Sequence, residues 1–314
     1  MKVGVALGSG SARGFAHIGI LEYLQERGVH VDVVAGTSIG AIVGASYACG
    51  NLDRLKAQAL NINRLNWTAF FNPSFSFDGW INLKHMQMFL VKSGIPRKMN
   101  IEDLKMPFGT VTCDLNTGKE LWVTEGPVFD AVWPSMAMPG VFQPVLNKEN
   151  RWCIDGGIVN PVPVSLCRAL GADVVIAVNL NSDLLTKNRN PRAEQKKKPS
   201  EIYKLVQKAK KLIPAKYQKE TLQNDMPEPP DFFETIASSI NIAQDRITKT
   251  RLAGDPPEVT LQPKLSRIGL LETYRAEEAI AEGRRCCELA FPQIRDALDL
   301  VQVEEGESSS DSHI

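Results

Sequence analysis

Two kinds of hydrophobic spacing alternate along residues 1–50, and this alternation limits the fold more than any other feature of the chain. An apolar run at 3–7 is followed by a Gly/Ser loop, a helical spacing through 18–24 and a second apolar run at 31–35. A tight turn at 36–38 then leads into another helical pattern. Strands and helices that alternate in this way form a largely parallel sheet covered on both faces. We therefore predict an α/β fold with three layers, in which a largely parallel central sheet lies between helices.

Strand and helix signals continue after this start. Two β-rich runs between Phe108 and Glu125 flank Asn116-Thr117-Gly118, which predicts a hairpin. Further strands are expected at 151–154, 172–180 and 259–261, and helices at 164–170 and from 271 to about 301. We expect one domain over residues 1–303 with an excursion at about 182–231. Residues 304–314 are acidic and serine-rich, and we expect them to form a disordered tail.

Charge is balanced over the whole chain but not along it. The 36 basic and 36 acidic side chains cancel, which argues against nucleic acid as a partner. Residues 187–219, however, contain twelve lysines and arginines and only two acidic residues, for a net charge of +10. Residues 201–213 within this segment have the spacing of an amphipathic helix. The pattern favours peripheral contact with an anionic membrane, for example the inner membrane surface, although an ordinary solvated helix has the same pattern.

The cysteines and apolar stretches indicate the compartment. The six cysteines have neither the spacing of a disulfide scaffold nor that of a zinc site, so we expect free thiols and no metal. The stretch between Asp32 and Asp53 is uncharged, but glycines and serines interrupt it, and we do not expect it to span a membrane. Residues 1–7 lead directly into a Gly/Ser loop and lack the pattern of a secretory signal. These features predict a cytoplasmic protein.

Gly36-Thr37-Ser38-Ile39-Gly40 has the pattern G-x-S-x-G of a nucleophile elbow, between an apolar strand and a helix. The glycines Gly36 and Gly40 allow a strained turn that lifts the Ser38 hydroxyl out of the sheet. The following helix points its N-terminal amides at the same place. The alternative is a tight turn with Ser38 as an ordinary helix cap.

The loop Gly8-Ser9-Gly10-Ser11 precedes Ala12-Arg13-Gly14 at the start of a helix. Loops of this kind bind phosphate or a dinucleotide in some proteins, but the glycine spacing and the acidic residue of a dinucleotide site are missing here. Beside a nucleophile elbow, the same loop fits an oxyanion hole built from the amides of Gly10 and Ser11, with Ser9 as a third candidate. A nucleotide-binding protein is therefore the weaker interpretation.

The histidines do not supply the base of a conventional Ser-Asp-His triad. His17 and His30 precede Ser38, and the only histidine after Asp155 is His313. His17 is expected to be structural or to orient the Gly/Ser loop by a hydrogen bond. Asp155 ends an apolar strand and is followed by Gly156 and Gly157, so its carboxylate is a candidate general base for Ser38. An ordinary Asp-Gly turn has the same pattern.

The three elements, in this order, resemble the patatin-like phospholipase family. The resemblance is carried by Arg13 and Gly14 in the loop, the elbow at Ser38, and Asp155-Gly156-Gly157. Residues 14–19, 138–142 and 155–163 are similar to the bacterial small-protein branch that is related to the catalytic domain of neuropathy target esterase. The resemblance is strong over residues 1–180 and loose over 231–301. It implies a patatin-like fold, a Ser38–Asp155 dyad and an oxyanion hole formed by the loop. Many members have glycine where this chain has Ser9 and Ser11.

These observations together predict a serine esterase that hydrolyses lipid acyl esters, phospholipid or lysophospholipid, through an acyl-serine intermediate and without a cofactor. A second interpretation is a non-hydrolytic lipid-binding regulator or adaptor on the same fold. Aromatic side chains cluster between residues 67 and 80, and they form either a lid over an acyl chain or part of the core. They are Trp67, Phe70, Phe71, Phe75, Phe77 and Trp80. Oligomeric state cannot be inferred from this sequence.

Overall fold

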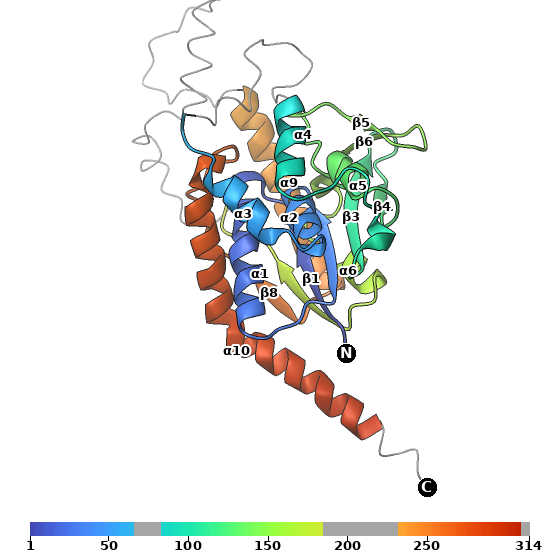
Figure 1. Ribbon diagram of the computed structural model, residues 1–314, viewed down its shortest axis with the longest axis vertical. Coiled ribbons are helices and arrows are strands. Elements are labelled where there is room, and N and C mark those ends of the chain that lie inside the picture. The colour runs from blue at the N-terminus through green and yellow to red at the C-terminus, as the bar shows by residue number, and fades with distance from the viewer. Residues whose placement is uncertain (66–82, 185–231, 309–314) are drawn as a thin grey trace, which may run out of the picture.

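The structure is a computed structural model that describes residues 1–65, 83–184 and 232–308 (Figure 1). Its centre is a sheet of eight strands in the order β5-β6-β3-β2-β1-β7-β8, with β4 paired to β3. The strands β1, β2, β7 and β8 are parallel to their sheet neighbours, as is β3 to β2, whereas β4, β5 and β6 are antiparallel. Their bounds are β1 Val3–Leu7, β2 Val33–Thr37, β3 Phe108–Asp114, β4 Glu120–Val123, β5 Val145–Leu146, β6 Trp152–Asp155, β7 Val174–Val178 and β8 Val259–Leu261.

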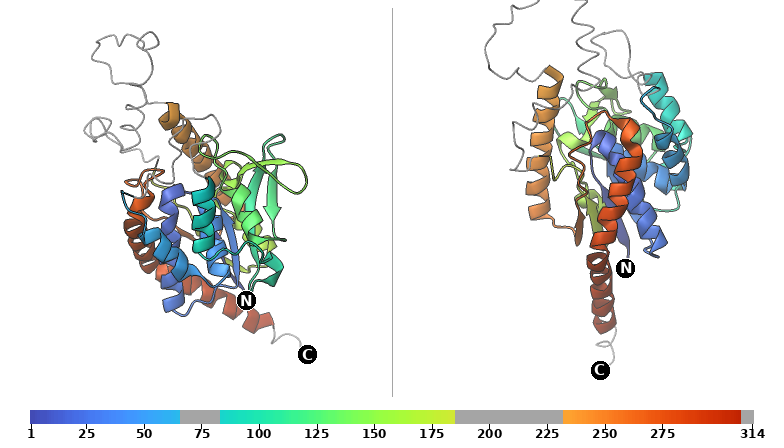
Figure 2. Two further views of the ribbon diagram at one scale, coloured as in Figure 1. Left: turned by 45° about the horizontal axis from the view of Figure 1, so that its top comes forward. Right: turned by 90° about the vertical axis from the view of Figure 1, so that its left-hand side faces the viewer.

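Helices cover both faces of this sheet. One face carries α1 Ala16–Glu26, α2 Ile39–Ala48, α3 Leu52–Leu60, α5 Val128–Ser135 and α10 Ala276–Ser308, and the other carries α6 Val164–Ala169 and α9 Phe232–Gly254. The helix α4, Leu83–Lys92, packs beside α3. Figure 2 shows α9 on the opposite side of the molecule from α3 and α4. The predicted three-layer α/β fold is confirmed.

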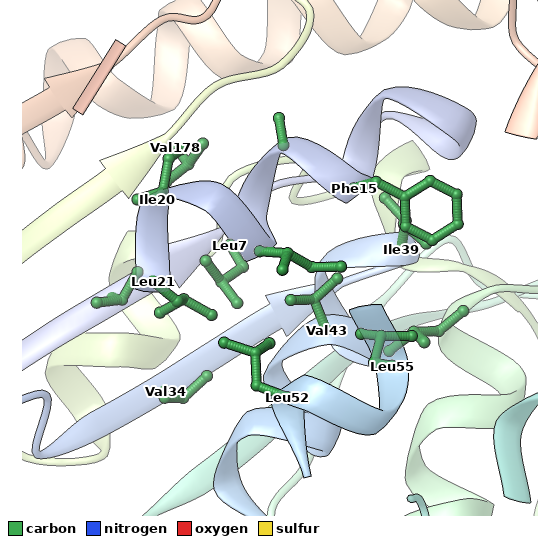
Figure 3. Close-up of a cluster of buried hydrophobic side chains, with 14 of the residues drawn as sticks. Leu7, Phe15, Ile20, Leu21, Val34, Ile39, Val43, Leu52, Leu55 and Val178 are labelled. Carbon is green, nitrogen blue, oxygen red and sulfur yellow. The ribbon is translucent and has the colours of Figure 1, made fainter. Parts of the chain in front are cut away.

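The central strands form because their sequences are apolar on both faces. Every residue of β1, β2 and β7 is buried, as expected for parallel strands between two helical layers. The larger core cluster joins Leu7 and Val178 of the sheet to Ile20, Val43 and other side chains of α1, α2 and α3 (Figure 3). The strand predicted at 31–35 is shifted to 33–37, because Gly36 pairs with both Leu7 and Thr110.

The predicted hairpin is confirmed by β3 and β4, and the predicted strand at 259–261 has the observed bounds. The last helix differs from the prediction at both ends. Residues 273–275 form a short 3-10 helix, and α10 continues to Ser308, into the segment for which we predicted a disordered tail. Most of the basic excursion, and all six aromatic residues at 67–80, lie outside the described residues. No helix in the described part of the chain is both long and apolar enough to cross a membrane.

The helices α1 and α10 cross with their backbones in close contact. A Cβ atom on Gly283 would lie 2.0 Å from the carbonyl oxygen of Ala16, and one on Gly19 would lie 2.0 Å from that of Ile280. Since these neighbours are backbone atoms, a larger residue forces the two helices apart. Gly19 and Gly283 therefore allow α10 to pack directly against the backbone of α1.

We expect Gly283→Ala to lower the free energy of unfolding by about 1–3 kcal/mol, the usual cost of overpacking a well-packed contact. Gly254→Ala is the matched control, because a Cβ there meets nothing within 4 Å. Thermal or urea unfolding of both variants measures the difference. Equal stability of the two variants would contradict the proposed tight crossing.

Candidate active site

The strand β3 brings Ser38 and Asp155 together. Residues 110–113 of β3 pair with β4 along one edge. The strand β2 pairs with residues 108–111 of β3, and β6 pairs with residues 112–114. Each of these parts overlaps the part paired with β4, so β2 and β6 both lie along the other edge of β3. Thr37, the last residue of β2, is paired with Val111, and Asp155 is paired with the next residue, Thr112. The two strands therefore end at adjacent positions of β3, with Ser38 directly after β2 and Asp155 as the last residue of β6.

Ser38 occupies a strained turn between β2 and α2. Its backbone angles are φ 58° and ψ −122°, in a region that side-chain-bearing residues rarely adopt. The Ser38 amide donates a hydrogen bond of 3.0 Å to the hydroxyl of Ser135, which in turn donates to the carbonyl of Val111 at 2.6 Å. The Thr37 hydroxyl donates to the carbonyl of Asn160 at 2.9 Å. The elbow is thus held by hydrogen bonds at Thr37 and at Ser38 itself.

The Ser38 hydroxyl donates a hydrogen bond of 2.5 Å to Oδ2 of Asp155. The other carboxylate oxygen, Oδ1, accepts the Gly157 amide at 2.7 Å. Asp155 is only 2% exposed, and this burial raises its pKa to about 6, although the hydrogen bonds from Ser38 and Gly157 lower it in part. At neutral pH the carboxylate is therefore mostly ionised and has its proton affinity close to the working range, as a general base requires.

The Gly/Ser loop offers two amides to this site instead of the three predicted. The Ser9 amide donates to the carbonyl of Pro161 at 2.8 Å, so it is not available to an oxyanion. The amides of Gly10 and Ser11 donate to no acceptor within the described residues, and both residues line the same pocket as Ser38. Ser11 has a positive φ of 53°, which turns the loop at this point.

Hydrogen bonds from buried polar side chains fix the conformation of the Gly/Ser loop. Arg13 is 4% exposed and donates to the carbonyl of Ile268 at 3.0 Å and to Oδ1 of Asn181 at 2.9 Å. Asn181 donates in turn to the Ser9 carbonyl at 3.2 Å. His17 lies 2.8 Å from the Gly8 carbonyl through Nε2. Burial lowers the pKa of His17 to about 4, so its ring is neutral and orients the start of the loop.

The motif glycines lie where neighbouring atoms, of the backbone or of side chains, leave no room for a Cβ. A Cβ on Gly40 would lie 2.0 Å from the carbonyl oxygen of Leu7, so only glycine lets α2 begin this near to β1. Gly157 is similarly confined beside Asp155. The remaining predicted glycines, Gly14, Gly36 and Gly156, also lie in tight contacts around the elbow and the dyad. Within residues 1–65, 83–184 and 232–308, no cluster of three or more His, Cys, Asp or Glu side chains is arranged to hold a metal ion.

Two pockets meet at Ser38. The larger encloses about 770 Å³, including its open mouth, and is almost entirely apolar. The smaller spans about 320 Å³, also including the open solvent at its mouth, and is lined by Asp155, the Gly/Ser loop and side chains of α9. Ser11, Ser38 and Met138 line both pockets, so Ser38 lies at their junction. Apolar side chains of the larger pocket include Ile42, Ile62, Met86, Phe89, Val141 and Phe142.

A family model described as "Patatin-like phospholipase" matches residues 5–168, which contain the loop, the elbow and Asp155. The chain belongs to the patatin-like phospholipase family. Membership in this family implies a lipid acyl hydrolase, and the fold and the order of the motifs agree with it.

Several curated proteins are similar to this chain. Uncharacterized NTE family proteins of Mycobacterium bovis and Mycobacterium tuberculosis are each 28% identical over 352 aligned positions, which cover 98% of this chain and 94% of theirs. Patatin-like phospholipase domain-containing protein 6 of Homo sapiens is 31% identical over 217 positions, covering 63% of this chain and 16% of that protein. These relatives confirm the predicted relationship to neuropathy target esterase. The crystal structure of VipD from Legionella pneumophila matches with a TM-score of 0.47 and 13% identity, covering 92% of this chain and 66% of that one.

Three residues of the site were not predicted from the sequence: Ser135, Asn181 and Gln244. Ser135 ends the helix α5, whose one charged side chain, Asp130, is exposed, whereas Ser135 itself is fully buried. A polar residue among the apolar residues of this helix is the one available signal that its hydroxyl has a buried partner. Asn181 and Gln244 lie in segments far from the motifs, and nothing in their local sequence distinguishes them. Their contacts arise only when the sheet brings the segments together.

We expect Ser135→Ala to slow the reaction of Ser38 by about tenfold, because the buried Ser38 amide and Val111 carbonyl both lose a partner. The rate at which a fluorophosphonate labels Ser38 measures this effect. Ser239→Ala is the control, since that hydroxyl donates to the Thr235 carbonyl on the exposed side of α9. Unchanged labelling of Ser135→Ala would show that the elbow does not depend on this contact.

Proposed function

We propose that the protein is a serine esterase that hydrolyses lipid acyl esters, with phospholipid or lysophospholipid as substrate. Ser38 is the nucleophile and Asp155 the general base. The observation that carries the proposal is the 2.5 Å hydrogen bond between Ser38 Oγ and Asp155 Oδ2, at the junction of an apolar pocket and a loop with two available amides. Family membership supports the same chemistry.

Acylation begins when Ser38 Oγ attacks the ester carbonyl carbon and its proton passes to Asp155. The negative charge that develops on the carbonyl oxygen is stabilised by the amides of Gly10 and Ser11. The tetrahedral intermediate then expels the alcohol, which takes the proton from Asp155, and leaves an acyl-Ser38 ester. In deacylation, water attacks this ester while Asp155 accepts a proton from the water. The bond to Ser38 Oγ then breaks, Asp155 returns the proton to Oγ, and the fatty acid leaves.

The apolar pocket supports a lipid as the acyl donor. Its lining offers aliphatic, aromatic and methionine side chains but few polar groups, so it stabilises a hydrocarbon chain by removing it from water. Ser38 lines this pocket where it adjoins the smaller one, so the carbonyl of a bound acyl chain can reach the nucleophile. The lining contains no charged side chain among the described residues, so a charged acyl group is disfavoured.

The place of action is also a proposal. We infer a cytoplasmic protein that contacts anionic membranes peripherally through residues 187–219, on the basis of that segment's net charge of +10. An enzyme with an apolar acyl pocket gains from such contact because its substrate resides in the membrane. The basic segment lies outside the described residues, so its support is sequence composition alone.

The dyad is tested with Ser38→Ala and Asp155→Asn on short-chain and long-chain p-nitrophenyl esters. We expect both variants to lose at least about a thousandfold in kcat/KM, since each removes a group that reacts. Ser239→Ala serves as the matched control and should retain wild-type activity. Circular dichroism confirms that each variant is folded.

Two outcomes would contradict the proposal. Retention of the wild-type rate by Ser38→Ala would exclude Ser38 as the nucleophile. A wild-type protein inert on all esters and lysophospholipids would instead favour the non-hydrolytic lipid-binding protein, which uses the same pocket without turnover.

A further inference from the structure

Gln244 of α9 faces the dyad from across the smaller pocket. Its side chain is buried, with 6% exposure, and it lines this pocket together with Ser38 and Asp155. No sequence motif singles it out, and the mechanism above does not use it. A largely buried amide thus lies next to Ser38 and Asp155 without a role in the proposed mechanism.

The orientation of this amide is fixed by a chain of hydrogen bonds that starts at Arg13. A guanidinium can only donate, so the Asn181 atom that lies 2.9 Å from Arg13 Nη1 is the oxygen Oδ1. The Nδ2 of Asn181 is then the atom that donates to Gln244, at 3.1 Å, and the Gln244 atom that accepts it is Oε1. The Ser9 hydroxyl donates to the same Oε1 at 3.3 Å. The amide nitrogen Nε2 is consequently the free end of the side chain.

Nε2 lies against Gly157, beside the catalytic carboxylate. A Cβ built on Gly157 would be 2.5 Å from Gln244 Nε2 and 2.9 Å from Asp155 Oδ1. No acceptor within the described residues takes a hydrogen bond from Nε2. Nε2 is not one of the fully buried polar atoms that lack a partner, so it is accessible from the smaller pocket, which Gln244 lines. Its hydrogens are available to an acceptor bound there. The position and the unused hydrogens both indicate a group that acts on something bound in the pocket.

The two pockets divide an ester substrate between them. The apolar pocket suits the acyl chain, so the smaller pocket on the other side of Ser38 receives the alcohol half. Asn241, one helical turn before Gln244, also lines the smaller pocket. No lysine, arginine or histidine does so among the described residues. Uncharged amide donors match the hydroxyl oxygens of a polyol better than they match a phosphate.

We propose that Gln244 Nε2 donates a hydrogen bond to a hydroxyl oxygen in the alcohol half of the substrate, beyond the ester bond. Gln244 is thereby a specificity-determining residue that favours acyl esters of glycerol-like alcohols over simple alkyl esters. The inference rests on the proposed function, because it assumes that Ser38 cleaves an ester held across the two pockets.

The test compares kcat/KM for 1-hexanoylglycerol and propyl hexanoate, which share the acyl chain and the three-carbon alcohol skeleton. We expect the wild type to prefer the glycerol ester, and Gln244→Met to reduce that preference about tenfold. Gln244→Glu keeps an oxygen for Ser9 and Asn181 but replaces the donor, so it should lose the preference as well. A defect in folding or in the oxyanion loop lowers both rates together and cancels in the ratio.

Ile242→Ala is the matched control on α9, since Ile242 is 48% exposed and should leave the ratio unchanged. Equal use of the two esters by the wild type, or an equal loss on both in the Gln244 variants, would overturn this inference and leave the proposed function intact. A wild type that cleaves neither ester nor any lysophospholipid would overturn the proposed function, and this inference with it.

Discussion

The site depends on the pairing of two strands along one edge of β3. β2 arrives parallel and ends at Thr37, and β6 arrives antiparallel and ends at Asp155, one position further along the same edge. This arrangement brings Ser38 and Asp155, which are 117 residues apart in sequence, within 2.5 Å of each other. Because backbone hydrogen bonds fix both strand ends, the distance between Ser38 and Asp155 is set mainly by the backbone.

Burial raises the pKa of the Asp155 carboxylate, and it also makes the charged form of this group less stable. A rise in pKa from 3.8 to about 6 corresponds to a few kcal/mol of destabilisation of the charged form, at roughly 1.4 kcal/mol per pKa unit. The hydrogen bonds from Ser38 and Gly157 offset part of this cost and hold the oxygen in place. The same environment therefore raises the proton affinity of Asp155 and limits its motion, which is what the proposed role as general base requires.

Sequence reasoning reached the parts of the site that lie in local motifs. Strand ends, glycines and tight turns leave a signal within a few residues, so Ser38 and Asp155 could be named as candidates, and the structure places them in hydrogen-bond contact. The strand and helix pattern predicted the layers. The engagement of the Ser9 amide with Pro161, and the contacts of Ser135 and Gln244, could not be predicted, since each joins segments that meet only in the folded sheet. The extent of α10 beyond Val303 was missed because acidic, serine-rich composition also favours disorder.

The pH dependence of the labelling of Ser38 by a fluorophosphonate tests the central claim most directly, with the modified residue located by mass spectrometry. Asp155 activates Ser38 only when ionised, so the labelling rate should rise with pH through a midpoint near the raised pKa of about 6 and level off above it. Asp155→Asn should abolish this rise. Labelling at another residue, or a rate on Ser38 that is independent of pH between 4 and 8, would contradict the account.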